Sequence, residues 1–358
     1  MSNIRPITAA NPNTALEDAL WWLKTSGVVN DSRNGRVVQA PAPVISVYTK
    51  PEQRVVYSAL RDANPFFHLY EALWMLAGRN DVDTVSYYAK QMTAFSDDGA
   101  VLHGAYGFRW RAWFGSDQLK EIIALLKCDP KSRRAVLTMW SPNGDLIAAE
   151  GGVGGINAKD VPCNTQVYFD MTRGVMDMTV CNRSNDAIWG CYGANVVHMS
   201  FLQEFMARTL GVPVGVYYQF SNNFHMYVDR EDCQRLMDAS AADKAQWSIR
   251  YTADDRYAQG MGTFPLFFAP EESEAWLADC EAVAHFPTAD HHGRHPFFRD
   301  VVVPMMSAHA AYKDGDLPRA ITLAGGCKAP DWRAAGVEWL ERRLRKQMSG
   351  DGVGVPVQ

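Results

Sequence analysis

The chain has 358 residues, 47% hydrophobic and 21% charged, a balance typical of a globular protein with a sizeable core. Its formal net charge of −5 argues against a basic surface for nucleic acid, so an anionic ligand would need local arginines. The seven cysteines form no C-x-x-C pair, and the chain shows no signal-peptide core and no apolar run near the ~20 residues of a membrane helix, so we expect a cytoplasmic protein without disulfides or membrane spans.

The first half of the chain alternates helical and β-rich patterns. Residues 1–13 are expected to form a loose arm, and the helix that follows is expected to begin at Thr14 and stop at Gly27. Residues 142–160 are rich in Gly, Asn and Asp, which predicts a loop. Apolar spacing predicts helices over 14–27, 64–78 and 120–130, and strands within 31–48 and 133–140.

The second half continues the pattern and then becomes helical. Residues 161–184 predict two strands around a turn at 172–174, followed by a helix over 194–211 and a strand that enters a loop within 215–227. After residue 265 the pattern predicts helices over 275–286, 302–315 and 330–347. We interpret the chain as an α/β (α+β) catalytic core, residues 1–265, with a helical C-terminal extension, residues 266–358, packed on it.

One cysteine has a neighbourhood suited to chemistry. Cys163 follows a proline between two β-rich segments, where a cysteine is more often inert core. Arg183 and Ser184 lie 20 and 21 residues later, a separation that returns a chain to the same end of an adjacent strand. A guanidinium beside a thiol favours the thiolate, so the pattern indicates a candidate nucleophile.

Two adjacent arginines form a second candidate. Arg133 and Arg134 open a predicted strand, and neighbouring strand residues point to opposite faces. They are either a solvated basic pair or, across a bend or a subunit boundary, part of one anion site. In the second case Ser184 and the bidentate guanidinium groups would suit a phosphate.

Two further residues each allow two interpretations. Glu71 stands in an apolar helix, either on its solvent-exposed face or buried, where burial would fit a carboxyl to proton transfer. Asn195 begins a predicted helix and is either its N-cap or a reader of a base edge, because its amide offers a donor and an acceptor.

Two other patterns carry little weight. The glycines of 151–155 are followed by neither Lys-Ser/Thr nor a helical pattern, so a phosphate loop is not predicted. A polar loop contains His285, Asp290, His291, His292 and His295. Their spacing matches no zinc pattern, and we predict no metal site.

Six short motifs occur in order: YGFRWRAW, SRR, PC, RSND, GAN and HMY. Together they resemble the thymidylate synthase superfamily over residues 28–230, closest in motif details to the phage pyrimidine hydroxymethylases of dUMP and dCMP. LYEALWMLAG resembles the family's helix that carries the active-site glutamate. The resemblance implies a mixed sheet with flanking helices, and it does not cover residues 266–358.

The resemblance also implies a reaction and its participants. Cys163 would add to C6 of the pyrimidine, which turns C5 into a carbon nucleophile. The one-carbon donor would be 5,10-methylenetetrahydrofolate, without a metal. The implied catalytic residues are Cys163, Glu71, Arg183, Tyr106 and Asp186.

The implied binding residues come from several segments. Arg33, Arg183 and Ser184 would bind the 5′-phosphate, with Arg36 as the alternative to Arg33. Arg133 and Arg134 would reach the phosphate from a partner subunit, which implies a homodimer. The remaining implied contacts are His225 and Tyr227 with the sugar, Asn195 with the base, and Asp186 and Met92 on the cofactor side.

The departures from the synthase pattern point to the product. Asn164 follows the nucleophile where a synthase typically has His, and the stretch ahead of YG holds Met92 and Phe95 but no tryptophan. In the family, leaving the exocyclic methylene open to water favours hydroxymethyl over methyl. WGCYGAN is one residue longer than the usual synthase loop, so Ala194 is the ungapped match to Asn195.

We therefore expect a folate-dependent dUMP hydroxymethylase, because Asn at the base-reading position suggests uracil. The alternatives within the family are thymidylate synthase and a dCMP hydroxymethylase or methylase. The alternative of another class is a catalytically silent homologue that binds nucleotide or RNA. If the protein is encoded by a phage, its location would be the host cytoplasm.

Overall fold

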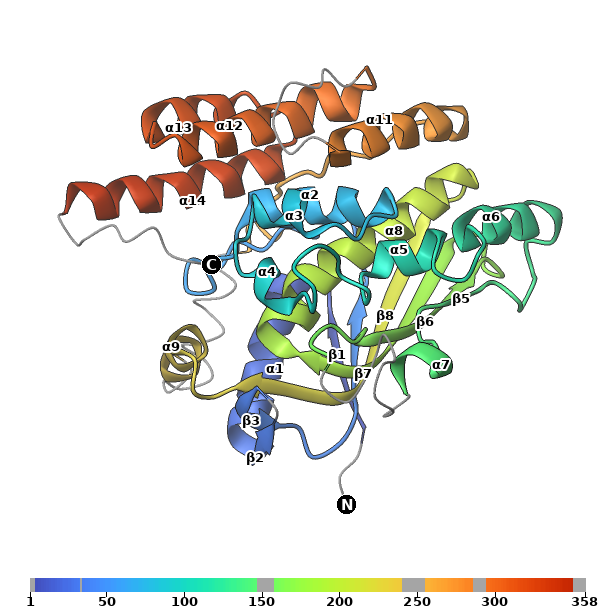
Figure 1. Cartoon of the computed structure of the whole chain (residues 1–358), viewed down its shortest axis with the longest axis horizontal. Helices are drawn as coiled ribbons and strands as arrows, with labels where there is room; N and C mark the ends of the chain where they lie inside the picture. The colour runs from blue at the N-terminus through green and yellow to red at the C-terminus, as the bar shows by residue number, and fades with distance from the viewer. Residues whose placement is uncertain (1–3, 33, 147–157, 240–254, 286–293, 350–358) are drawn as a thin grey trace.

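A mixed eight-stranded sheet forms the centre of the molecule (Figure 1). The computed structural model describes residues 4–32, 34–146, 158–239, 255–285 and 294–349. The strands are β1 (Arg5–Ala9), β2 (Val28–Ser32), β3 (Gly35–Gln39), β4 (Val44–Tyr48), β5 (Val136–Thr138), β6 (Asn164–Asp170), β7 (Met176–Asp186) and β8 (Val214–Tyr227).

The strand order is β1-β4-β8-β7-β6-β5, and the β2–β3 hairpin joins β8 through β3. β1 runs parallel to β4 and β7 runs parallel to β8, whereas the other pairs are antiparallel. The predicted α/β class with a mixed sheet and flanking helices is confirmed. The turn between β6 and β7 contains Gly174 at φ +75°, a conformation that glycine adopts without steric cost.

The N-terminal prediction was wrong in two respects. Residues expected to form a loose arm include β1, which hydrogen-bonds to β4 some forty residues later. The first helix begins earlier than Thr14, because the Asn11 side chain accepts from the Asn13 N–H and caps it. Its predicted end at Gly27 is confirmed.

The helices precede, separate and follow the strands. The segment 215–227, expected to enter a loop, is strand throughout, and η1 is a π-helical segment that leads into α8. Up to residue 239 the helices are α1 (Pro12–Ser26), α2 (Pro65–Leu76), α3 (Val82–Ser86), α4 (Met92–Phe95), α5 (Tyr106–Arg111), α6 (Gln118–Cys128), α7 (Pro142–Asp145), η1 (Ala187–Ala194), α8 (Asn195–Thr209) and α9 (Glu231–Ala239).

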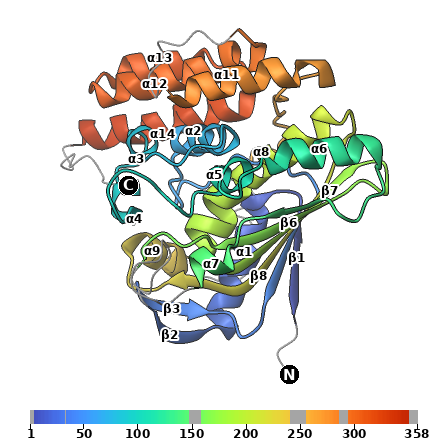
Figure 2. The same cartoon turned by 45° about the vertical axis from the view of Figure 1, so that its right-hand side comes forward.

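A second helical layer lies above α2 and α8 (Figures 1 and 2). The predicted helices within 275–286, 302–315 and 330–347 are confirmed, and α13 was not predicted. The layer consists of η2 (Pro270–Glu272), α11 (Ser273–His285), η3 (Phe298–Val302), α12 (Val303–Lys313), α13 (Leu317–Gly325) and α14 (Pro330–Met348). The division into core and extension at residue 265 stays a prediction.

Helix α2 is buried at every position because it lies between α8 and this layer. Asn64 caps its N-terminus by accepting from the N–H groups of Phe66 and Phe67, and Pro65 occupies the first turn. Gly78, at φ +74°, follows the helix and reverses the chain. Glu71 is the single carboxylate of this fully buried helix.

The two faces of the sheet differ in their covering. η1 packs on one face, where Ser46 hydrogen-bonds to Tyr192 and Cys191 donates to Gln219. On the opposite face the register places Ile45 beside Phe220 and Val47 beside Tyr218, all only partly buried. Figure 2 shows the helices gathered on one side of the sheet.

In the described parts of the chain, no helix has the length and apolarity to cross a membrane. The cytoplasmic location stays a prediction.

A buried polar chain joins the second layer to the core. Tyr257 donates its hydroxyl proton to Asp331 of α14 at 3.1 Å and accepts from the backbone N–H of Val55. Asp255 accepts from the N–H of Tyr257 and from the Asn11 amide, so the chain reaches the start of α1. Burial raises the pKa of Asp331 to about 6.

This raised pKa predicts a pH-dependent stability. The folded-state pKa of Asp331 exceeds the value near 3.9 of an unfolded aspartate, so its favourable contribution is complete below pH ~4 and is lost as pH rises through 6. Asp331→Asn should therefore gain free energy of unfolding relative to wild type as pH rises, by about 1.3 kcal/mol between pH 5 and 7.5.

Urea unfolding across that pH range measures the difference. The control is Glu341→Gln on the same helix, whose carboxylate is exposed. A difference between Asp331→Asn and wild type that does not change with pH would contradict the prediction.

Candidate active site

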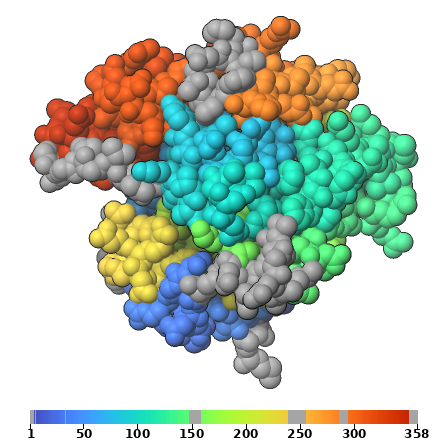
Figure 3. Space-filling model, in the orientation of Figure 1, coloured from blue at the N-terminus to red at the C-terminus, as the bar shows by residue number. Residues whose placement is uncertain are grey.

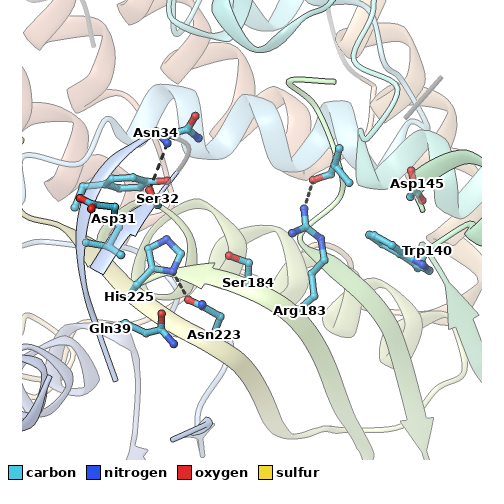
Figure 4. A pocket seen from close by; sticks show the side chains of 13 residues that line it. Asp31, Ser32, Asn34, Gln39, Trp140, Asp145, Arg183, Ser184, Asn223 and His225 are labelled. Atoms are coloured by element: carbon cyan, nitrogen blue, oxygen red, sulfur yellow. Dashed lines mark hydrogen bonds between the residues drawn. The ribbon is translucent and has the colours of Figure 1, made fainter. Parts of the chain in front are cut away.

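A cavity of about 410 Å³ opens beside the paired strands β7 and β8. The β2–β3 hairpin forms one side of it, and Trp140 and Asp145 lie on the other, with Arg183 and Ser184 between (Figure 4). In Figure 3 a hollow is visible between the blue hairpin, the yellow α9 and the cyan segment above them. The lining residues are Asp31, Ser32, Asn34, Val37, Gln39, Trp140, Asp145, Val161, Arg183, Ser184, Asn223, His225 and Tyr227.

The parallel register of β7 and β8 brings predicted residues together. Ser184 pairs with Asn223, and Asp186 pairs with His225, across some forty residues of sequence. The His225 ring nitrogen Nδ1 lies 2.9 Å from the Asn223 side-chain oxygen. Four of the residues predicted for phosphate and sugar, Arg183, Ser184, His225 and Tyr227, therefore line one cavity.

Arg183 ties the nucleophile segment to the sheet. Its Nε donates to the carbonyl of Pro162 and its Nη2 to that of Val161, both at 3.0 Å. Its backbone N–H donates to the carbonyl of Cys163, also at 3.0 Å. The guanidinium carbon lies 5.5 Å from the centre of the Trp140 ring. Cys163 is thus held at the edge of the cavity that Arg183 lines.

Tyr106 and Asn164 surround Cys163 with polar groups. Burial raises the pKa of Tyr106 well above its ordinary value, and the nearby Cys163 raises it further, so the phenol stays protonated. Asn164 is fully buried, and neither its amide oxygen nor its amide nitrogen has a partner among the described residues. An orphaned amide next to the nucleophile offers a donor and an acceptor to a bound molecule.

Asp186 begins η1 and also offers an unpaired oxygen. Its Oδ1 accepts from the N–H groups of Ile188 and Trp189 at 2.9 and 2.5 Å. Its Oδ2 is buried with no hydrogen-bond partner in the described part of the chain. Burial raises the pKa of Asp186, and burial also lowers that of His225 against the opposing effect of Asp186.

Asn195 is oriented by a short hydrogen-bonded chain. Its Nδ2 donates to the side-chain oxygen of Asn185 at 3.2 Å, and Asn185 donates to Ser221 at 3.0 Å. Asn195 makes no capping bond, so its interpretation as an N-cap was wrong. The kink at Tyr192 and Gly193 in η1 accommodates a wide turn in the longer WGCYGAN segment, directly before Asn195.

Glu71 is buried, and the alternative of a solvent-exposed face was wrong. It is 5% exposed, and its Oε2 lies 2.8 Å from Nε2 of His198 on α8, a residue that is 2% exposed. Neither residue lines the cavity described above. The sequence analysis missed His198, although its place three residues after Asn195 puts both on one face of α8.

Several predicted residues lie elsewhere. Arg133 and Arg134 are exposed and precede β5 rather than opening it, and neither lines the cavity. Arg33 lies outside the described residues, and Arg36 forms an exposed ion pair with Asp229 at 2.6 Å. Met92, the first residue of α4, packs partly buried against the core.

The metal and phosphate-loop patterns add nothing to the site. Within the described ranges, no group of three or more His, Cys, Asp or Glu side chains is placed to hold a metal ion. Of the histidine-rich segment, Asp290, His291 and His292 lie outside these ranges, as do the glycines of 151–155.

A buried ion pair supports the wall of the cavity. Arg109 of α5 binds Asp145 through two hydrogen bonds of 2.6 and 2.8 Å, and both side chains are excluded from solvent. Arg109 also donates to the carbonyls of His103 and Met139. Arg109 belongs to the YGFRWRAW motif, but the motif does not reveal its partner 36 residues later.

Comparisons with known proteins agree with this arrangement. The family model for thymidylate synthase matches residues 54–259. A deoxyuridylate hydroxymethyltransferase of Pseudomonas phage M6 is 46% identical over 347 residues, 95% of each chain. That of Bacillus phage SP01 is 38% identical over 218 residues, 56% of this chain and 55% of that protein. A putative thymidylate synthase of Methanothermobacter thermautotrophicus is 35% identical over 140 residues, 39% and 57% of the two chains.

The Arg109–Asp145 pair predicts a large loss of stability on mutation. Arg109→Met should lower the free energy of unfolding by about 3–5 kcal/mol, because it leaves the Asp145 carboxylate buried without its cation. Urea denaturation measures the loss. The matched control is Arg173→Met, which breaks an exposed ion pair with Asp177 and should cost less than about 1 kcal/mol. Equal losses in the two variants would contradict the prediction.

Proposed function

Because this chain belongs to the thymidylate synthase family, we propose that it is a dUMP hydroxymethyltransferase. The reaction is dUMP, 5,10-methylenetetrahydrofolate and water giving 5-hydroxymethyl-dUMP and tetrahydrofolate. The observation that carries the proposal is the near full-length similarity to a phage deoxyuridylate hydroxymethyltransferase. The geometry of the site supports it residue by residue.

The cavity suits the phosphate and sugar of a nucleotide. Arg183 and Ser184 stand side by side on β7 and offer a cation and a hydroxyl to the 5′-phosphate. His225 and Tyr227 line the neighbouring part of the cavity from β8 and would hold the sugar hydroxyl. The Asn195 amide, oriented by Asn185, would pair with the uracil edge by giving to O4 and accepting from N3–H.

Cys163 supplies the covalent step. The thiolate Sγ bonds to C6 of the uracil, and the electron pair of the C5–C6 double bond moves toward C5 and O4, which makes C5 nucleophilic. Arg183 holds the backbone of this segment and places its positive charge beside it. When the product forms, the Sγ–C6 bond breaks, the C5–C6 double bond returns and the thiolate leaves.

The residues on the cofactor side fit a reduced folate. The unpaired Oδ2 of Asp186 is a buried acceptor, and a pterin ring presents N–H donors of the kind it requires. Asp186 and Met92 would hold the folate, which supplies a one-carbon unit at the oxidation level of a methylene. After C5 has bonded to that unit, loss of the C5 proton and departure of tetrahydrofolate would leave a carbon–carbon double bond from C5 to the one-carbon unit. Water, rather than a hydride, then bonds to that unit, and Glu71 accepts the proton that the water loses.

We propose that the protein acts as a homodimer. Among the described residues, Arg183 is the single arginine that lines the cavity, whereas a phosphate carries up to two negative charges. Arg133 and Arg134 are exposed away from it and would reach the cavity of a partner subunit. The partly exposed sheet face that carries Ile45, Val47 and Phe220 offers an apolar surface for the second copy.

The product identifies the reaction. We expect purified protein to convert dUMP and methylenetetrahydrofolate into a nucleotide heavier by CH₂O, measured by mass spectrometry, without the near-ultraviolet signal of dihydrofolate.

Cys163→Ser should show no turnover yet bind dUMP with nearly unchanged affinity, because the phosphate-binding residues remain. Dihydrofolate formed in step with a methylated product would identify a thymidylate synthase instead, and dUMP binding without turnover by wild type would favour a silent homologue.

The base preference tests Asn195. Asn195→Asp should shift the ratio of kcat/KM from dUMP toward dCMP by roughly ten- to a hundred-fold, because a carboxyl can accept from the cytosine amino group and a mismatched pair leaves a buried polar group unsatisfied. The measurement is kcat/KM for both nucleotides in both proteins. A wild type that prefers dCMP contradicts the uracil assignment, and an unchanged ratio in the variant removes Asn195 as the base reader.

A further inference from the structure

We propose that His198 is a positioning residue that holds the Glu71 carboxylate and shares a proton with it during hydroxymethyl transfer. The inference rests on the proposed function and extends it to a side chain outside the motifs that identify the family. It is carried by an ion-pair distance, by the burial of both groups and by what surrounds them.

The pair joins two helices in a solvent-poor part of the molecule. Glu71 lies mid-way along α2 and His198 in the first turns of α8, and the two helices pack together. The Oε2–Nε2 distance is 2.8 Å. The described residues place no Lys or Arg within ion-pair distance of Glu71, and a carboxylate without any partner would be costly at this depth. His198 is therefore the partner placed to share a proton with Glu71.

The two helices that carry the pair, α2 and α8, also carry or contact residues of the proposed reaction centre. Asn195, the proposed base reader, lies one helical turn before His198 on α8. Met75 lies one turn after Glu71 on α2, and its backbone approaches Gly107 so closely that a Cβ there would fall 1.9 Å from the Met75 carbonyl oxygen. Gly107 follows Tyr106, which lies beside Cys163. The helix of His198 thus carries the proposed base reader, and the helix of Glu71 contacts the segment of Tyr106.

The other nearby histidine is unsuited to this role. His68 lies one turn before Glu71 on α2 and is also buried. Its pKa is lowered well below the ordinary value, first by burial and then by the positive charge of Arg61. His68 therefore stays neutral. His198 additionally has a buried Nδ1 with no hydrogen-bond partner among the described residues, so its ring is not committed to a second protein group.

The pair can take up a proton without leaving it on the carboxyl group. When water bonds to the one-carbon unit on C5, the electron pair of that unit's double bond moves into the ring, and the Sγ–C6 bond breaks. The proton lost by the water passes to Glu71 and can rest on Nε2 of His198, which leaves Glu71 as a carboxylate. Carboxylic acid with imidazole and carboxylate with imidazolium carry the same total charge, so the exchange needs no new counter-ion.

The test separates a proton-handling role from a structural one. His198→Leu removes both ring nitrogens at similar volume, and we expect kcat to fall about 100-fold while KM for dUMP stays within about three-fold. His198→Gln keeps one N–H donor and should retain several-fold more activity than His198→Leu. The matched control is His309→Gln, a buried histidine of α12 that packs between Phe66 and Tyr88 and should keep wild-type kcat.

A double-mutant cycle decides whether His198 acts through Glu71. We expect Glu71→Gln combined with His198→Leu to be no slower than Glu71→Gln alone, because the histidine has lost the group it serves. Additive losses would overturn the proposal, as would a kcat of His198→Leu within three-fold of wild type, or a loss confined to KM. If His198→Leu fails to fold, His198→Gln in the same cycle decides.

The experiment distinguishes a failure of this inference from a failure of the proposed function. An active wild type with an equally active His198→Leu ends this inference alone. A wild type that makes no product from dUMP ends the proposed function, and the inference with it.

Discussion

The parallel pairing of β7 with β8 determines where the candidate site lies. A parallel pair brings the same ends of two strands together, so polar residues that close both strands meet at one edge of the sheet. Here that edge carries Ser184 beside Asn223 and Asp186 beside His225. The same end of β7 carries Arg183, whose hydrogen bonds reach back to the segment of Cys163. One register thus positions the segment of Cys163, the proposed phosphate-binding residues and the start of η1.

Three buried carboxylates of the core each lie beside a basic side chain. Arg109 holds Asp145 in the cavity wall, Glu71 faces His198, and Arg54 binds Glu204 beneath α8. Each pair joins segments far apart in sequence, so removing one partner would expose the other to the cost of an uncompensated buried charge. Two of the buried polar groups that lack hydrogen-bond partners among the described residues, the Asn164 amide and the Asp186 Oδ2, lie near the proposed reaction. Such unpaired polar groups are expected where a ligand completes the hydrogen bonding.

The C-terminal helices have a direct consequence for the chemistry. α11, α12 and α14 pack against α2, the helix that carries Glu71, and exclude solvent from the side of α2 that they contact. That layer covers the side of α2 that carries Phe66, Tyr70 and Leu73, while Glu71 faces His198 of α8. The near full-length similarity to a phage hydroxymethyltransferase extends beyond the segment that the family model matches. The layer thereby belongs to the protein's catalytic architecture in our proposal.

The sequence by itself determined the α/β class, most elements and the family resemblance, and it indicated the candidate reactive residues that our proposal uses. Helical and strand periodicity are local signals, and the motifs around Cys163, Arg183 and His225 are short and ordered. Only the tertiary structure decided that β1 pairs with β4, that Glu71 is buried against His198 and that Arg109 binds Asp145. Those contacts join segments that share no local pattern. The local sequence around a buried carboxylate also does not differ from that around an exposed one, because burial depends on which elements pack against it. The roles that we propose for Arg133 and Arg134 involve a second subunit, which one chain's periodicity does not encode.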